Sequence, residues 1–214
     1  DHGEADKAAF QTKAEIEIPF AGVAYQKIYS FDEIADKLYM KMHNMTIKTE
    51  ILRSHQILLD EHCYYVDTEY ITYPIPYVNT ICFVDAFVYY YRLGREGQSV
   101  GMDKMQKNEQ NYDKVLASLL HFYQQLGREL PCTQAKKQYI ARLIARVIAG
   151  KFKIMLSFPP SEEKKQQIKQ YDKHLKTQYR DIYDSNINKA VALLRKTQYH
   201  TYYLANMLVR RTYR

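Results

Sequence analysis

Residues 58–99, LLDEHCYYVDTEYITYPIPYVNTICFVDAFVYYYRLGREGQS, place an acidic cluster before a long apolar and aromatic run. The cluster holds four carboxylates within ten residues, namely Asp60, Glu61, Asp67 and Glu69. The run from 77 to 91 is dense in β-branched and aromatic residues, which predicts two strands joined by a tight turn or one strand with a bulge. We therefore expect the chain to be organised around this stretch, with a scaffold before it and a helical appendage after it.

The junction between the acidic cluster and the aromatic run predicts a short helix. This helix should begin near Val66 and end before Pro74, because proline cannot continue a helix. Asp67 would lie in its first turn, where the helix dipole favours a carboxylate. Two interpretations stay open: the acidic residues only cap the helix, or Asp67 and Glu69 form a partly desolvated site suited to general-base chemistry.

Other side chains of the same stretch could contact a substrate. Arg92 and Arg95 follow the aromatic run and could bind a phosphate or a sugar, or form structural ion pairs. The rings of residues 89–91 could stack on a sugar, although alternate members of a strand point into the core. Asp60 and Glu61, by contrast, are interpreted as solvated loop charges.

The residues before the acidic cluster predict few regular elements. Residues 14–18 alternate apolar and charged side chains, as in an edge strand. Ser30 and Glu33 form a capping box, so a helix should begin directly after Ser30. The apolar face of that helix would carry Ile34, Leu38 and Met42.

From residue 102 onward the apolar residues repeat with the period of an α-helix. Breaks at 127–131, 158–163 and 184–186 divide this pattern, so we predict a bundle of about four helices. Thr133 should cap the second of them. The predicted apolar stripes are Val115, Leu116, Leu119, Leu120, Tyr123 and Leu126; Ile140, Leu143, Ile144, Val147, Ile148, Phe152 and Met155; Ile168, Tyr171, Leu175, Tyr179 and Ile182; and Ile187, Val191, Leu194, Tyr202 and Leu204.

The composition indicates a folded chain with an uneven charge. With 214 residues, 46% of them hydrophobic, it can bury the core of one domain or of two small ones. Residues 1–100 carry nine Lys/Arg and fifteen Asp/Glu, whereas residues 101–214 carry twenty-two and nine. The basic part predicts an anionic partner such as a membrane surface, although an ordinary solvated face has the same composition, and no motif indicates specific nucleic-acid recognition. The expected basic surface comprises Lys136, Lys137, Arg142, Arg146, Lys151 and Lys153, with Arg210, Arg211 and Arg214 at the end of the chain.

Cysteine and hydropathy patterns argue against several classes of protein. The three cysteines have no CxxC spacing and the seven histidines are scattered, so neither a disulfide framework nor a structural zinc site is expected. The longest uncharged run, residues 70–84, is short and contains two prolines, so it does not predict a membrane span. We expect a reduced, cytoplasmic chain that is soluble or peripheral to a membrane.

Several short motifs follow one another in a characteristic order. They are MTIKTEIL at 45–52, LDE at 59–61, YVDTEY at 65–70, IPYV at 75–78, VYYYR at 88–92 and GQSV at 97–100. Their order resembles family 2 glycosyltransferases and is most similar to the bacterial enzymes of capsule and exopolysaccharide synthesis that have a helical C-terminal extension. Together the motifs cover about residues 30–105, and their succession is more specific than any one of them.

This resemblance implies the acceptor-side part of a GT-A type domain over residues 1–100, followed by a basic helical domain over residues 101–214. The expected fold class is α+β, mostly helical, with few strands. The resemblance also implies that Asp67 is the catalytic base and that Glu69 is the second candidate, because Val66 stands where the family commonly has the first acid of its motif. The residues expected to bind substrate are Tyr70, Tyr91, Arg92 and Arg95.

The implied reaction is an inverting transfer of a sugar from a nucleotide-sugar donor to a hydroxyl group of a glycan or lipid-linked acceptor. In the family, an Asp-x-Asp motif holds a divalent Mg or Mn ion that stabilises the departing diphosphate. This sequence has no Asp-x-Asp and begins at Asp1 without Met. We therefore expect part of a larger enzyme, peripheral at the inner face of the plasma membrane, that holds no metal and is inactive alone. A non-enzymatic basic helical module that binds a partner protein or a nucleic acid remains the alternative.

Overall fold

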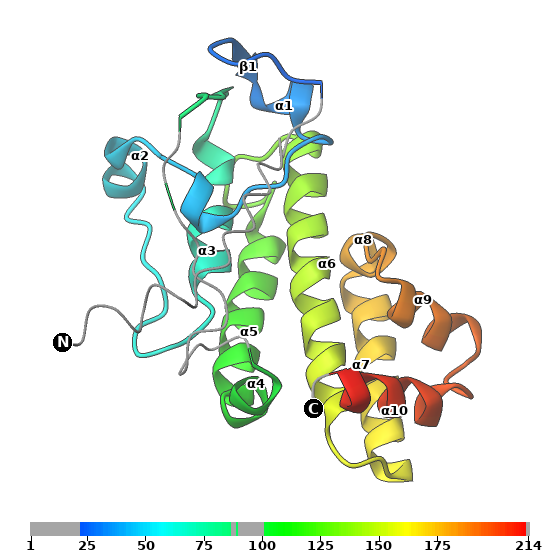
Figure 1. The fold of residues 1–214 in the computed structure, drawn as a ribbon. Helices are drawn as coiled ribbons and strands as arrows, with labels where there is room; N and C mark the ends of the chain where they lie inside the picture. Colours follow the sequence, from blue (N-terminus) through cyan, green and yellow to red (C-terminus); the bar gives the residue numbers. More distant parts are fainter. Residues whose placement is uncertain (1–21, 87–88, 90–100, 213–214) are drawn as a thin grey trace, which may run out of the picture.

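The computed structural model describes residues 22–86, 89 and 101–212, which form a mostly helical α+β protein (Figure 1). Two short strands pair antiparallel, with Ile28 opposite Cys82. Before residue 100 the elements are β1 (Ile28–Ser30), α1 (Phe31–Ile34), the 3-10 turn η1 (Met42–Asn44), α2 (Thr49–Ser54), α3 (Asp67–Thr72), the 3-10 turn η2 (Ile75–Tyr77) and β2 (Thr80–Cys82). After it they are α4 (Met102–Lys107), α5 (Glu109–Gln125), α6 (Gln134–Ser157), α7 (Glu162–Gln178), α8 (Arg180–Asp184), α9 (Lys189–Lys196) and α10 (Tyr202–Thr212).

Helix α6 lies at the centre of the molecule. It packs against α4 and α5 on one side, against α7, α8 and α10 on the other, and against α1, α3 and η2 (Figure 1). Its buried side chains surround most of its circumference, as expected for a helix inside a core. Among the described residues, the element that most others contact is α6 rather than any element of the stretch 58–99 around which the sequence predicts the chain to be organised.

Local sequence signals set the ends of the α5–α6 hairpin as predicted. Gly127, two residues after the end of α5, has a φ of 79°, a conformation that glycine adopts without strain. The Thr133 hydroxyl oxygen accepts a hydrogen bond from the Lys136 backbone N–H (3.3 Å) and caps α6. The predicted stripe of α5 is buried at Val115, Leu116 and Leu119.

The described residues after 100 form seven helices rather than about four, because the last two predicted helices are each broken and Asn108 separates α4 from α5. Tyr179 (φ −136°, ψ 54°) separates α7 from α8, and Gln198 and Tyr199, with φ values of 50° and 68°, precede α10. Tyr179 and Tyr199 still pack on the core, so the apolar period continues through both breaks and conceals them. Ile187 and Leu204 do not belong to a buried stripe, since they are 81% and 49% exposed.

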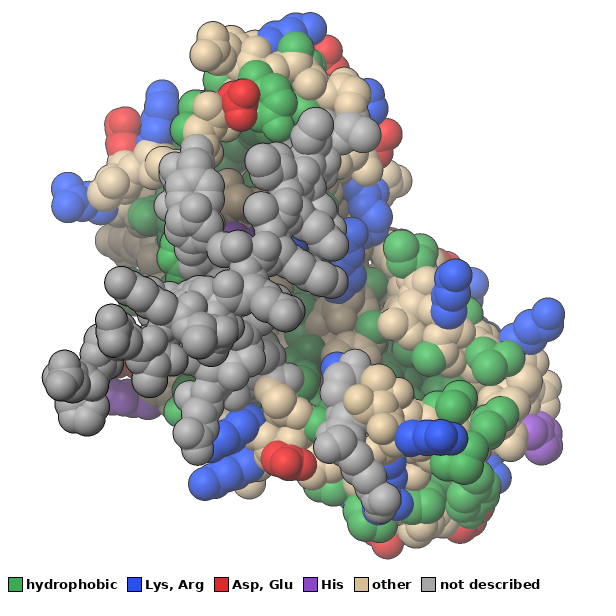
Figure 2. Space-filling view, in the orientation of Figure 1, with side chains coloured by type: hydrophobic (Ala, Val, Ile, Leu, Met, Phe, Trp, Pro, Cys, Tyr) green, Lys and Arg blue, Asp and Glu red, His purple; other side chains and the backbone are tan. Residues whose placement is uncertain are grey.

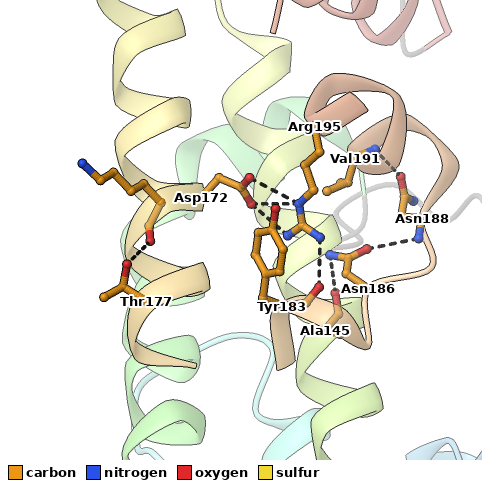
Figure 3. A network of polar contacts seen from close by, with 9 residues as sticks. Ala145, Asp172, Thr177, Tyr183, Asn186, Asn188, Val191 and Arg195 are labelled. Carbon is orange, nitrogen blue, oxygen red and sulfur yellow. Dashed lines mark hydrogen bonds and ion pairs between the residues drawn. The ribbon is translucent and has the colours of Figure 1, made fainter. Parts of the chain in front are cut away.

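A buried ion pair joins α7 to α9 (Figure 3). Arg195 donates to Asp172 Oδ1 from Nη2 (2.8 Å) and from Nε (3.0 Å). Its Nη1 donates to the Tyr183 carbonyl (2.9 Å), and its guanidinium lies 3.5 Å from the centroid of the Tyr183 ring. The Asn186 amide donates to the Ala145 carbonyl of α6 (3.2 Å). These contacts hold α7, α8 and α9 together beside α6.

The N-terminal elements begin where the capping signals predict. The Ser30 N–H donates to Glu33 Oε2 (3.4 Å), which confirms the start of α1. This helix ends after four residues, so only Ile34 and Leu38 of its predicted face are buried. Met42 lies in η1 and is exposed, contrary to the prediction.

The acidic and aromatic stretch forms less regular structure than predicted. α3 ends at Thr72, before Pro74, as expected. Of the strands predicted over 77–91, the described residues contain β2. Residues 87–88 and 90–91, and the edge strand predicted at 14–18, lie outside the described residues.

Several cations on α6 hold the helix against its neighbours, and two members of the predicted basic surface, Lys136 and Lys151, are buried. Lys136 is buried and donates to the Pro76 carbonyl (2.9 Å). Lys151 is buried between Glu109 and Asp113 of α5. Arg142 donates to the Ala35 carbonyl (2.7 Å), and Arg146 lies over the Tyr39 ring (4.1 Å to its centroid). Lys136 and Lys151 are therefore out of reach of a flat anionic partner, whereas Arg146 remains exposed.

Residues from both halves of the sequence share one hydrophobic core. The rings of Phe31 and Tyr139, for example, meet edge to face with centroids 5.5 Å apart. The predicted domain boundary at residue 100 falls where the structure describes no residues, so it stays a prediction. Among the described helices, none combines the length and the apolar character needed to cross a membrane.

Gly150 allows α5 to approach α6 closely, which makes a prediction about stability. An added Cβ would overlap the Tyr112 hydroxyl group, which donates to the Val147 carbonyl (2.7 Å). Gly150→Ala should therefore lower the free energy of unfolding by roughly 1–3 kcal/mol, although alanine normally favours a helix interior.

Urea denaturation can test this effect. Gly101→Ala is the matched control, because a Cβ there meets open space. Adding Tyr112→Phe to Gly150→Ala should recover part of the loss, and the absence of any recovery would contradict the steric explanation.

Candidate functional site

The two carboxylates of α3 lie in different environments. His62 and Tyr65, with φ values of 53° and 73°, turn the chain sharply just before the helix. Asp67 and Glu69 are two residues apart on α3, so they project about 200° apart around its axis. Asp67 is exposed, whereas Glu69 has 0% exposed surface. The structure thus separates the pair that the sequence presents as one cluster.

Asp67 lies at the first residue of α3. Local desolvation of its carboxyl group raises the pKa above the ordinary aspartate value, even though much of the residue is exposed. The backbone N–H groups of Asp67 and Thr68, and the charge of His43, act in the opposite direction. The result is a carboxylate at the surface that is more basic than an ordinary aspartate, as a general base requires.

His43 and Tyr89 extend this site beyond α3. The turn η1 packs against α3, and His43 lies close enough to Asp67 for each to change the pKa of the other. The His43 ring stacks on the Tyr89 ring, with centroids 5.6 Å apart and an angle of 28° between the planes. Tyr89 is 57% exposed, so it presents an aromatic surface beside His43. Sequence reasoning missed His43, because no motif or spacing connects it with Asp67.

The Glu69 carboxyl group is buried beneath α3. Its Oε2 accepts a hydrogen bond from the Asp60 backbone N–H (2.9 Å), while Oε1 is buried without a hydrogen-bond partner among the described residues. Burial, together with the nearby charge of Asp60, raises the pKa of Glu69 to about 7. This position gives Glu69 a role in packing the loop that precedes α3, away from solvent.

Asp60 ties the same loop to α5. Its Oδ2 accepts a hydrogen bond from the Ser118 hydroxyl (3.0 Å), and its Oδ1 lies 3.6 Å from Lys114 Nζ. The interpretation of Asp60 as a solvated loop charge is therefore wrong. The sequence did not reveal this role, because Ser118 and Lys114 lie more than fifty residues further along the chain.

The raised pKa of Glu69 predicts how stability should change with pH. Between its ordinary value of 4.5 and about 7, the folded protein keeps a proton that the unfolded chain loses. Glu69 therefore makes its full contribution to the free energy of unfolding below about pH 4.5. This contribution decreases as the pH rises toward 7, by on the order of 3 kcal/mol. Glu69→Gln should remove much of this decrease, because the amide stays neutral and its oxygen can accept from the Asp60 N–H.

Urea denaturation at pH 5 and pH 8 measures this difference. Glu61→Gln is the matched control, because Glu61 is exposed beside the same loop and should keep the wild-type pH dependence. A Glu69→Gln variant that loses stability with pH as steeply as the wild type would show that Glu69 does not titrate in this window.

The residues predicted to bind substrate are only partly described. Tyr70 is half-buried and packs on the hydrophobic core next to Asp67. Tyr91, Arg92 and Arg95 lie outside the described residues, so their contribution stays a prediction.

An open cleft of about 490 Å³ lies between the end of α5 and the break between α7 and α8. Its wall includes Arg128, Lys137, Arg180 and Asp181. Asp181 Oδ2 accepts from the Tyr123 hydroxyl (3.0 Å), and Lys137 lies over the same ring, so part of this charge is already engaged. None of the predicted site residues lines the cleft, and we therefore place the candidate site at α3.

A divalent ion, which the resemblance implies, does not fit the described residues: no three His, Cys, Asp or Glu side chains among them converge to hold one. Comparison with known proteins identifies no relative, since no family model, curated protein or solved structure matches the chain.

Proposed function

We propose that this chain forms the acceptor side of an inverting, GT-A type family 2 glycosyltransferase of bacterial surface polysaccharide synthesis, with Asp67 as the base. The observation that carries this proposal is the contrast within α3. Asp67 is exposed and has a raised pKa, whereas Glu69 has no exposed surface. Asp67 is also the position of the base in the motif YVDTEY at 65–70, where the chain resembles that family.

Asp67 carries out one proton transfer in the proposed reaction. Its carboxylate accepts the proton of an acceptor hydroxyl group, whose oxygen attacks the anomeric carbon of the nucleotide sugar from the side opposite the diphosphate. The new carbon–oxygen bond forms as the bond to the diphosphate oxygen breaks, and the nucleoside diphosphate leaves with that electron pair. A single protein carboxylate is sufficient as the base, and the product has inverted anomeric configuration.

Tyr89 and His43 are suited to position the acceptor. Aromatic rings pack against the apolar faces of sugar rings, and Tyr89 offers such a face beside His43. Desolvation and the charge of Lys41 lower the pKa of His43, which favours the neutral imidazole. A neutral imidazole can donate and accept hydrogen bonds, so His43 could orient the sugar hydroxyl groups around the one that reacts.

In this proposal, the nucleotide-sugar donor is bound by residues other than those described in α3 and η1. The sequence contains no Asp-x-Asp, and the described residues offer no metal site. The nucleotide sugar and any divalent ion would then be held elsewhere in the natural protein. Residues 1–214 alone should bind acceptor glycans and transfer no sugar.

A transfer assay on the natural protein that carries these residues tests the proposal. The protein is incubated with acceptor glycans and a panel of labelled nucleotide sugars, and the anomeric configuration of the product is determined by NMR. Transfer with inversion is the expected result. Absence of both transfer and donor hydrolysis across the panel would overturn the proposal, and turnover by residues 1–214 alone would overturn the assignment of the donor side to other residues.

A further inference from the structure

Helix α10 has an apolar outer face in addition to the face that holds it in the fold. On the inner side Tyr202 is buried, and the Asn206 amide donates to the carbonyls of Leu156 (2.7 Å) and Phe158 (2.8 Å) at the end of α6. These bonds fix which face of α10 points inward. The outer face carries four large apolar side chains that are each about half exposed: Tyr203, Leu204, Met207 and Leu208.

Further exposed apolar side chains lie on α9 and just before it. Leu193 is 47% exposed, and Ile187, just before α9, is the most exposed large apolar residue in the described part of the chain. Figure 2 shows apolar side chains gathered over the region of α9 and α10, with Lys or Arg side chains among them. We call these six residues, 187, 193, 203, 204, 207 and 208, the outer apolar face. A face of this kind on a helical surface indicates a binding surface.

The charged residues of the segment that contains α9 and α10 are all positive. Residues 185–214 contain six Lys/Arg and no Asp or Glu. Of these cations Arg195 is used inside the fold, whereas Arg210 and Arg211 form no ion pair with a described residue. One acid from α7 contacts this face: Glu162 accepts a hydrogen bond from the Tyr203 hydroxyl (3.4 Å), and it also pairs with Lys165 (3.3 Å). Residues 185–214 themselves contribute only positive charge around the apolar residues.

We propose that the outer apolar face, together with Arg210 and Arg211, docks the protein on an anionic membrane surface. Large apolar side chains beside Lys and Arg are typical of helices that lie in the membrane interface. The apolar groups enter the boundary of the acyl chains, the tyrosine ring remains at the headgroup level, and the cations meet anionic headgroups.

The same features disfavour other occupants. A second copy of the chain would add no acid from residues 185–214 to compensate the cations of this region. A nucleic acid would use the cations but would leave leucine and methionine side chains in water. The membrane uses both the charge and the apolar area. The predicted membrane contact through the cations of α6 is not supported, because Lys136 and Lys151 are buried.

Vesicle co-sedimentation tests this proposal, and it does not depend on the catalytic role of Asp67. Vesicles of phosphatidylcholine alone are compared with vesicles that contain phosphatidylglycerol, at low and high salt. Binding should require the anionic lipid and decrease with salt. Two surface variants, Leu204→Ser with Met207→Ser and Arg210→Gln with Arg211→Gln, should each weaken partition by at least about tenfold.

Matched controls change equally exposed residues elsewhere. Leu58→Ser with Met42→Ser controls for lost apolar area, and Lys37→Gln with Lys48→Gln controls for lost charge. Both should bind vesicles like the wild type, and melting curves should show that all variants are folded. Equal binding to neutral vesicles, no binding to any vesicle, or equal losses in the controls would overturn the proposal. A concentration-dependent dimer that disappears in the Leu204→Ser, Met207→Ser variant would also overturn it, because the face would then join two copies.

Discussion

Asp67→Asn is expected to reduce sugar transfer by the natural protein by about 10²- to 10⁴-fold, which is the usual contribution of a general base. The loss should appear in kcat, with little change in the KM for the acceptor, because the amide keeps the shape of the side chain and its hydrogen bonds to substrate. Asparagine is also favoured near helix starts, so α3 should remain folded. Steady-state kinetics and a melting curve on the same preparation provide the two measurements.

Glu69→Gln separates the two candidates for the base. Glu69 has no exposed surface, so this variant should keep most of the transfer activity. Glu61→Gln, which removes an exposed carboxylate close by, should have no effect on activity. If Glu69→Gln abolished transfer in a folded protein while Asp67→Asn retained it, Glu69 would replace Asp67 as the base.

The second large effect is expected at the ion pair between α7 and α9 (Figure 3). Asp172 is 5% exposed, and Arg195 places three of its donors on Asp172 and Tyr183. Asp172→Asn would leave the guanidinium charge buried without its counter-charge. We expect the free energy of unfolding to decrease by about 3–5 kcal/mol, measured by urea denaturation.

Arg180 and Asp184 provide the control for this prediction. They form an ion pair of similar length (2.6 Å), but both side chains are largely exposed, so Asp184→Asn should change stability little. A double change, Asp172→Leu with Arg195→Met, should cost less than Asp172→Asn alone, because it removes both buried charges. A double variant that is less stable than the single one would show that the pair itself, rather than an unpaired charge, determines the stability.

The candidate site was only partly predictable, as Asp67 and Glu69 show. The end of α3 follows from Pro74, and the position of Asp67 in its first turn follows from the motif at 65–70. The burial of Glu69 beneath the Asp60 loop could not be predicted in this way. It depends on a loop that Asp60 holds to Ser118 of α5. His43 was not predicted at all, because its proximity to Asp67 arises from the packing of η1 on α3.

The sequence by itself determined the elements whose signals are local. Caps at Ser30, Thr133 and Ser161 start three helices, and each acts on a backbone group three residues away. Such hydrogen bonds form in any tertiary context, so they can be recognised from spacing alone.

The tertiary structure alone decided which charged and apolar side chains reach solvent. Lys136 and Lys151 look like surface cations in the sequence, yet their partners are a carbonyl and carboxylates brought near by folding. Leu204 looks like a core residue, yet Tyr202 and Asn206 anchor the opposite face of α10. The physical reason is that a helical period specifies which residues share a face, whereas contacts between distant segments decide which face is covered.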